Sequence, residues 1–219
     1  MGRQLKNTGH AALARNGLPG RRSDFASHSG RERLGRLQGL AACDRLILDM
    51  VLRQIDTIEK ELDELDKAIV HMGKPLPGLP QLLQVRGFGL VAAIGVLSEI
   101  GDITRFAKAK QLVSYAGLAT TVRQSGAVER RGHITKQGRK VLRGFLVEAV
   151  LSMLRNPSPR NPLADFYQRK KQEKGAGKAI CATARKLLTV IHVLLTRHLD
   201  FWFLEERLYQ RKLQQLAAA

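Results

Sequence analysis

A strict heptad spacing of apolar residues is the feature that most restricts how this chain can fold. Apolar side chains recur at alternating intervals of three and four, at Leu48, Val51, Ile55, Ile58, Leu62, Leu65, Ile69 and Met72. Charged residues fill the positions between them, so the pattern predicts one long helix with a narrow apolar seam. We place this coiled-coil helix at residues 34–73, because Gly73 and Pro75 end it. The seam favours a coiled coil between protomers; the alternative is a long helix packed on its own domain.

The remaining segments divide by composition. Residues 1–33 are polar and basic without an apolar period, and we expect a disordered basic tail there. Residues 74–80, KPLPGLP, form a linker because Pro and Gly interrupt regular structure. Apolar helical periods predict a compact helical domain at residues 81–204, followed by a C-terminal tail at 205–219 that extends as a fraying helix. No alternating β-branched run is long enough to predict a sheet, so the predicted fold class is all-α.

The charge of the chain points to nucleic acid. Its 219 residues carry a formal charge of +18, and only 5% of them are aromatic. So large an excess exceeds that of an ordinary soluble enzyme. The alternative is a protein that binds the ribosome or a membrane surface. This sequence contains no lipid-facing basic helix with an aromatic face, so nucleic acid is the favoured partner. Cys43 and Cys181 have no metal-type spacing and are expected to be free thiols. With no secretion signal and no clear spanning segment, we expect no membrane partner and a cytoplasmic, nucleoid-associated protein.

A glycine-rich turn lies between two apolar segments of the predicted domain. The residues Arg86-Gly87-Phe88-Gly89 separate Leu82-Leu83 from the run Val91 to Ile100. Glycines there allow a close backbone approach, and free N–H groups open the second helix. The pattern is typical of a helix-hairpin-helix element that grips a phosphate backbone, with Arg86, Gly87 and Gly89 as contacts. The alternative is a plain packing turn between two core helices.

The most basic stretch runs from Ser114 to Phe145. Seven Lys or Arg lie between Thr120 and Arg143 against one acid, Glu129, and three glycines interrupt the stretch. It predicts a flexible cationic loop followed by a basic helix that opens near Lys136. Glycine turns, a helix N-terminus and clustered Arg together make an anion site. The candidate nucleic-acid contacts are Arg123, Gln124, Gly126, Arg130, Arg131, Lys136, Arg139 and Arg143.

Ser125 lies at the centre of this stretch and is directly followed by a glycine. A serine hydroxyl is a weak nucleophile that needs a base, a metal or a strongly cationic pocket. Arg123, Arg130 and Arg131 could supply that charge at a scissile phosphate. From the residues alone, a Ser-Gly turn that bonds its own backbone is the favoured interpretation. His133 is the nearby histidine, and its role as base, phosphate donor or exposed residue stays open.

Three groups of residues, in this order, carry a resemblance to a known family. They are LLQVRGFGLVAAIGVLSEIGDITRF, then GLA…RQSG…RGHITKQGRKVLR, then NP…FY followed by GKAICATARKLL. Over roughly residues 79–195 the chain resembles the C-terminal domain of bacterial insertion-sequence transposases, the bridge-RNA-guided recombinases with an N-terminal RuvC-like domain. The resemblance implies that Ser125 is the nucleophile and becomes joined to DNA through a phosphoserine bond. It implies insertion-sequence ends and target DNA as partners, raises a guide RNA as a further one, and implies homo-oligomers through the coiled coil.

The family also uses four acidic residues of the RuvC-like domain to hold two divalent metals. Eight of the 19 acids of this chain lie along the predicted coiled-coil helix at residues 34–73, and Asp24 and Glu32 lie in a polar tail. We therefore expect a C-terminal portion of a transposase that binds no cofactor of its own and is inactive alone. Mg²⁺ is expected only with a RuvC-like domain supplied by a partner. The alternative is a non-catalytic nucleic-acid-binding remnant that clamps the phosphate backbone and dimerises by its coiled coil.

Overall fold

The computed structural model describes residues 2–21, 23–125, 128–155 and 161–218, and describes residues 122–125 and 128–131 by their backbone alone. The chain forms two compact units, Met1–Lys67 and Ala68–Ala219. Each has its own apolar core, and we describe them separately. The described residues form ten α-helices and a single two-stranded hairpin, which confirms the all-α class.

The first unit contains helix where the sequence predicted a disordered tail. Helices α1 (Gly2–Arg15) and α2 (His28–Gly35) pack with the start of α3 (Ala42–Gly73). Leu13 and Phe25 are fully buried, and Gly9 leaves room for the Phe25 ring, since a Cβ there would lie 2.4 Å from it. The prediction of disorder is therefore wrong. Its apolar residues are too few for a helical period, but they fold against the apolar face of α3.

Helix α3 begins at Ala42, and not at Leu34 as predicted. The residues before it form a turn that includes Gly39 at a φ of 85°. Arg45 stabilises this turn, because its guanidinium donates to the carbonyl oxygens of Leu37 at 2.8 Å and Leu34 at 3.0 Å. Leu34 lies in α2, so the apolar residues at 34 and 37 belong to a separate helix and its C-terminal turn rather than to the heptad.

The heptad seam divides into a buried and an open part. Leu48, Val51 and Ile55 are buried within the first unit. Leu62 and Leu65, about two and three turns further along α3, are 53% and 54% exposed. The alternative of a helix packed on its own domain therefore describes the first part of the seam. The second part stays available to a partner, and the coiled coil between protomers remains a prediction.

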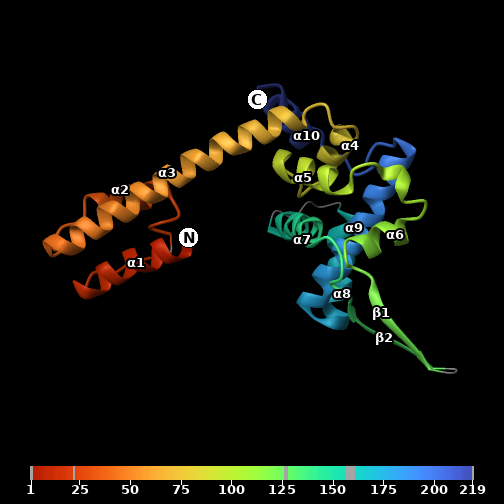
Figure 1. Cartoon of the computed structure of the whole chain (residues 1–219), viewed down its shortest axis with the longest axis horizontal. Helices are drawn as coiled ribbons and strands as arrows, with labels where there is room; N and C mark the ends of the chain where they lie inside the picture. Colours follow the sequence, from red (N-terminus) through yellow and green to blue (C-terminus); the bar gives the residue numbers. More distant parts are fainter. Residues whose placement is uncertain (1, 22, 126–127, 156–160, 219) are drawn as a thin grey trace. The chain divides into compact units, whose positions relative to one another are not determined.

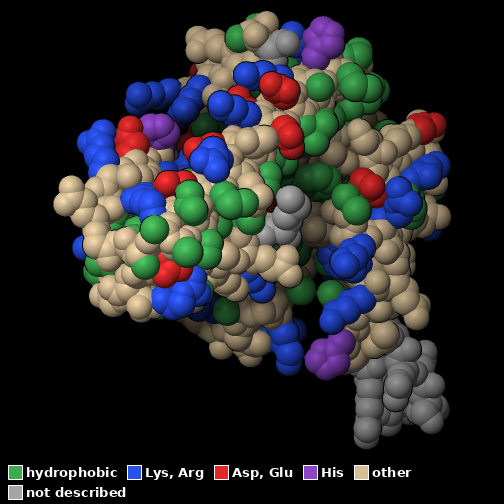
Figure 2. All heavy atoms as spheres, turned by 60° about the vertical axis from the view of Figure 1, so that its left-hand side comes forward, with side chains coloured by type: hydrophobic (Ala, Val, Ile, Leu, Met, Phe, Trp, Pro, Cys, Tyr) green, Lys and Arg blue, Asp and Glu red, His purple; other side chains and the backbone are tan. Residues whose placement is uncertain are grey.

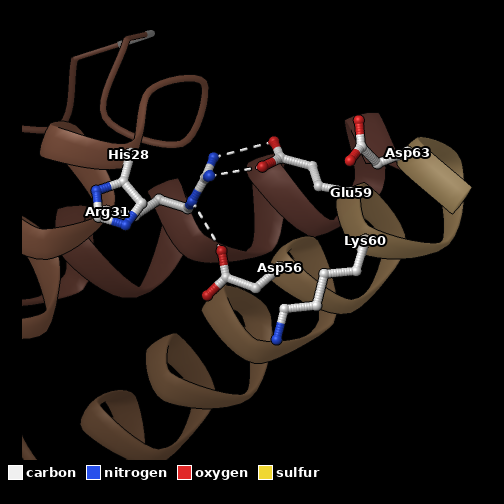
Figure 3. A pocket seen from close by; sticks show the side chains of 6 residues that line it. All are labelled: His28, Arg31, Asp56, Glu59, Lys60 and Asp63. Carbon is white, nitrogen blue, oxygen red and sulfur yellow. Dashed lines mark hydrogen bonds and ion pairs between the residues drawn. The ribbon is translucent and has the colours of Figure 1, made fainter. Parts of the chain in front are cut away.

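Ion pairs join α2 to α3, as Figure 3 shows. Nε of Arg31 lies 2.9 Å from Oδ1 of Asp56, and Nη1 of Arg31 donates to Glu59 at 3.0 Å. The surrounding hollow, of about 520 Å³, is also lined by Asp63. Its acids outnumber its free cations, so it is a poor site for a phosphate.

The second unit is built around one long apolar helix. Its elements are α4 (Leu79–Gln84), α5 (Leu90–Ile100), the 3-10 turn η1 (Ile103–Arg105), α6 (Ala109–Tyr115), α7 (Lys140–Arg155), α8 (Pro162–Lys174), α9 (Ala176–Arg197) and α10 (Glu206–Ala218). Helix α9 packs against α4, α6, α7 and α8, and α5 lies on α7 (Figure 1). The predicted linker at 74–80 shortens, since α4 begins at Leu79 with Pro80 in its first turn.

Helix α9 is long and apolar enough to cross a membrane by length and composition alone. Half of its apolar window is buried inside the unit. Its buried polar groups have partners there: Thr183 Oγ1 donates to the Ala179 carbonyl at 2.9 Å, and the His192 ring lies 2.8 Å from the Phe106 carbonyl oxygen. These features are typical of the central helix of a folded core.

The predicted cationic loop is a β-hairpin. Strands β1 (Thr120–Ser125) and β2 (Val128–Ile134) pair antiparallel and extend away from the helices of the second unit (Figure 1). Thr120, Thr121 and Val122 favour a strand, but they are too few to stand out as an alternating run. The hairpin closes where the Thr135 N–H donates to the Ala119 carbonyl at 2.8 Å. The prediction of a flexible loop is wrong, because the strand-forming residues are too few to be recognised from the sequence pattern.

The helix after the hairpin begins four residues later than predicted. Lys136 has a φ of +55°, which is incompatible with a helix start, and Gly138 has a φ of +145°. A Cβ on Gly138 would lie 2.3 Å from the Tyr115 carbonyl oxygen. Because the chain must pass this close to the end of α6, α7 can begin only at Lys140.

The C-terminal tail is also more ordered than expected. It forms α10, whose Tyr209 and Leu216 pack against the core of the second unit. Lys212 is buried, and its Nζ donates to the carbonyl oxygen of Leu83 at 2.6 Å. An ammonium group there satisfies a carbonyl at the end of α4, so α10 is part of the domain.

Candidate nucleic-acid interface

The positive charge of the chain is concentrated in the second unit. Residues 68–219 hold 25 Lys and Arg against 9 Asp and Glu, which gives +16 of the total +18. Figure 2, which draws both units, shows Lys and Arg side chains together with some Asp and Glu on the visible face of the chain. A polyanion is therefore attracted mainly to the second unit. Its binding depends on which Lys and Arg side chains lack a partner within the unit.

The hairpin brings Ser125 into register with two of its predicted arginines. Ser125 pairs with Val128, and Arg123 pairs with Arg130, across the antiparallel ladder. Residues directly opposite, and residues two apart on a strand, share one face. The backbone therefore assigns Ser125, Arg123 and Arg130 to one face of the hairpin.

The remaining predicted residues of the hairpin occupy other positions. Gln124 pairs with Glu129, and Val122 pairs with Arg131, so Gln124 and Arg131 belong to the opposite face. Gly126 lies outside the described residues. His133 is exposed on β2, and its carbonyl accepts a hydrogen bond from Thr121 Oγ1 at 3.2 Å. Lys136 follows the strand and is exposed at the base of the hairpin.

Two of the predicted phosphate contacts have partners inside the second unit. Arg143 is half-buried, and its Nη1 donates to the Ala116 carbonyl at 2.9 Å, next to the turn at Gly117. Nε of Arg139 lies 2.8 Å from Oε2 of Glu99, and this hydrogen bond raises the pKa of Arg139 above its usual value. Arg143 therefore supports the α6–β1 turn, and Glu99 compensates part of the charge of Arg139.

The two glycines of the turn between α4 and α5 have different surroundings: Gly87 packs against α7, and Gly89 is surrounded by open space. Gly87 has a φ of +100°, and a Cβ there would lie 2.2 Å from the Ala149 carbonyl oxygen of α7. Gly89 caps α5 in an ordinary conformation and has open space around it. Arg86 forms an ion pair with Glu205. The packing alternative thus accounts for Gly87, and the helix-hairpin-helix interpretation rests on Gly89 and the N-terminus of α5.

No metal site of the family type can be assembled from the described part of the chain. Within it, no three His, Cys, Asp or Glu side chains gather in a way that could hold an ion. The acids of α3 follow one another along a single helix, where several of them face Arg or Lys, as Asp56 faces Arg31. The described residues do not fit a two-metal centre, and we assign no metal-dependent step to them.

The sequence interpretation missed a group of residues around the C-terminal helix. Arg207, Gln210, Arg211 and Gln214 of α10 line a cavity of about 570 Å³ together with Arg86. Trp202, the only tryptophan of the chain, is 63% exposed just before this helix. The signal was the pair of arginines four residues apart, which puts both side chains on one side of a helix.

Comparison with known proteins finds a family match over part of the second unit. Residues 79–168, which run from α4 into α8 and include the hairpin, match the transposase family IS116/IS110/IS902. The match supports the assignment of this part of the chain to that family of insertion-sequence transposases.

Individual relatives agree with this assignment. The transposase of insertion sequence element IS1111A from Coxiella burnetii is 24% identical over 73% of this chain and 44% of its own length. The 43.6 kDa protein of insertion element IS110 from Streptomyces coelicolor is 27% identical over 74% of this chain and 39% of its own. A pilin gene-inverting protein of Moraxella bovis is 32% identical over 55% and 37% respectively. The chain spans less than half the length of each of these relatives.

Proposed function

We propose that this chain acts in DNA transposition or site-specific DNA recombination, as the DNA-contacting and serine-bearing part of a transposase. The observation that carries the proposal is the family match over residues 79–168, which contains the whole hairpin and Ser125. The names of the relatives, transposases and a pilin gene-inverting protein, point to the same class of reaction. The charge of the second unit supports DNA as the partner.

Ser125 is the proposed nucleophile. Its hydroxyl oxygen would form a bond to a backbone phosphorus while the bond from that phosphorus to a sugar oxygen breaks, which leaves a phosphoserine link to DNA. The shared face of Ser125, Arg123 and Arg130 supports this role, because two guanidinium groups at those positions would stabilise the charge of the pentavalent phosphate. A base must take the hydroxyl proton, and we propose that it comes from the partner that supplies the metal centre, so that exposed His133 on the same hairpin is dispensable.

We further propose that the site is completed by a partner. The family's metal centre would come from a RuvC-like domain, with Mg²⁺ as its ion, because the described residues offer no place for one. The open part of the seam at Leu62 and Leu65 supports assembly of copies through α3. A guide RNA is a further proposed partner of the same basic unit.

Covalent attachment to DNA tests the catalytic role. The chain is mixed with a full-length family member whose own serine is replaced by alanine, in the presence of Mg²⁺ and labelled insertion-sequence ends. A protein–DNA adduct of the mass of this chain is expected, and it should be absent with Ser125→Ala and kept with His133→Ala. An adduct that persists in Ser125→Ala would show that the serine is only a turn residue.

Salt-dependent binding to duplex DNA tests the hairpin as an interface. Replacing Arg130 and Arg131 by alanine should weaken binding and reduce the slope of log affinity against log salt by about two, because each phosphate contact releases roughly one counterion. Arg185→Ala with Lys186→Ala on α9 is a charge-matched control, since both are exposed outside the hairpin. An unchanged slope would place the phosphate contacts elsewhere.

A non-catalytic role is the second candidate. It is favoured by the lack of a fitting acidic cluster among the described residues. In that case the basic unit clamps the phosphate backbone, and α3 joins copies. Binding of duplex DNA with no adduct in any mixture would support it.

A further inference from the structure

An aromatic group is displayed on the surface between α9 and α10. Trp202 is 63% exposed and Phe203 38% exposed, while Phe201 beside them is buried. The ring centroids of Phe201 and Trp202 lie 5.6 Å apart, and those of Trp202 and Phe203 lie 6.0 Å apart. The hydrophobic effect normally buries such side chains. Two exposed rings that pack on the buried ring of Phe201 therefore suggest a contact surface.

The segment that carries the two rings is fixed to the domain. The side chain of Gln84, at the end of α4, donates to Oδ1 of Asp200 at 2.7 Å. Its carbonyl oxygen accepts from the Phe201 N–H at 2.6 Å. One buried amide thus holds two consecutive residues, and Phe201 anchors them in the core. Rings held in this way lose little conformational entropy when they bind.

The cavity next to this segment is cationic. Arg207 and Arg211 lie one turn apart on α10 and line it together with Gln210 and Arg86. Arg86 is paired with Glu205, so these two charges compensate each other. Among the described residues, no ion-pair partner is seen for Arg207 or Arg211, and both are exposed. Two guanidinium groups and amide donors in a cavity of about 570 Å³ suit the oxygens of a phosphodiester.

We propose that Trp202, Phe203 and the cavity at Arg207 and Arg211 form a site for an unpaired nucleic-acid strand. A base stacks on the exposed ring of Trp202, and a phosphate of the same strand binds Arg207 and Arg211, five and nine residues further along the chain. Stacking on aromatic side chains combined with a positively charged groove is the general way proteins hold single strands, because every base has a flat face. A paired base in a duplex has no free face for Trp202.

This inference rests on the proposed function, since it assumes a nucleic-acid partner, but it adds a second surface away from Ser125. The charge of the cavity selects this occupant over an apolar one. A protein segment or a second copy of the chain would cover the rings without using the arginines. Single-stranded DNA and an unpaired RNA segment share the same chemistry, and the experiment separates them.

Fluorescence anisotropy of labelled oligonucleotides tests the site. The probes are oligothymidylate, oligouridylate and a DNA duplex, and the proteins are the full chain, Trp202→Ala, Trp202→Phe and the double change Arg207→Ala with Arg211→Ala. Trp202→Ala should weaken binding of at least one single strand by about tenfold and leave duplex binding nearly unchanged. Trp202→Phe should retain most of the affinity, since it keeps an aromatic face. The double change should reduce the salt slope for that strand by about 1.4.

Controls keep the result decisive. Arg185→Ala with Lys186→Ala removes the same charge on α9, where no exposed aromatic group is involved, and should leave the effect of Trp202 in place. Circular dichroism verifies that each variant is folded, and the double change Arg207→Ala with Arg211→Ala tests the site if Trp202→Ala unfolds. The single strand whose affinity falls in Trp202→Ala, oligothymidylate or oligouridylate, shows whether the ligand of the site is DNA or RNA.

Two outcomes would overturn the site. One is single-strand affinity unchanged in Trp202→Ala; the other is sedimentation showing that Trp202→Ala only dissociates an oligomer. If duplex binding still falls with Arg130→Ala and Arg131→Ala, the proposed function stands while this site fails. If no nucleic acid binds the full chain, the proposed function itself fails.

Discussion

Two glycines of one turn, Gly87 and Gly89, illustrate how single residues divide between packing and function. We expect Gly87→Ala to destabilise the second unit by about 2 to 4 kcal/mol, because its positive φ and the approach to the Ala149 carbonyl leave no space for a Cβ. Gly89→Ala is the matched control and should change stability little, as its surroundings are open. Chemical denaturation measures both. Equal stability of the two variants would contradict the packing role of Gly87.

Lys212 makes a prediction at the same scale. Burial lowers its pKa from 10.5 to about 8. Between these pH values the unfolded chain binds the proton and the folded chain does not, so the free energy of unfolding should rise as pH increases from about 8 to 10. The rise is limited to on the order of 3 kcal/mol and should be missing in Lys212→Met. Denaturant titrations at several pH values measure it, and parallel curves for the two proteins would contradict it.

At the scale of the element, the apolar seam of α3 has a buried part and an exposed part. Its first apolar residues complete the core of the first unit, and Leu62 and Leu65 remain exposed. We predict that Leu62→Lys with Leu65→Lys converts an oligomer to a monomer, because charge in an apolar seam is costly. Sedimentation at micromolar concentration measures this. Glu61→Lys with Glu64→Lys is the control on the same helix.

The choice of these positions depends on the structure. Ile55 belongs to the same heptad, but it is only 5% exposed and packs inside the first unit. A lysine there would unfold this unit and would not report on assembly. A wild-type chain that is already monomeric would show that the open seam has no partner in this protein.

At the scale of the whole molecule, the two units have separate cores and unequal charge. We predict that a fragment of residues 68–219 folds alone and binds duplex DNA with most of the affinity of the full chain, because it carries 25 of the 37 Lys and Arg. Circular dichroism and the anisotropy assay measure both properties. The fragment of residues 1–67 is the comparison, and tighter binding by that fragment would contradict the assignment.

The sequence by itself determined the helical class, the basic character and the family resemblance. Each depends on information local to a segment: a heptad from Leu48, a surplus of Lys and Arg, and the ordered motifs around Ser125. Only the tertiary structure decided which arginines have partners. Arg86 meets Glu205, and Arg139 meets Glu99, across 119 and 40 residues of sequence.

The tertiary structure also determined which segments without a clear apolar pattern are folded. The first residues of the chain and the hairpin at Ser125 are not predicted as regular structure, and the C-terminal helix is expected to fray. They fold because distant groups complete them: the face of α3 covers Leu13 and Phe25, and the end of α4 receives Lys212. Periodicity reports on what one segment repeats along its own length. Burial and ion pairing depend on which segments meet, and the folded chain alone determines that.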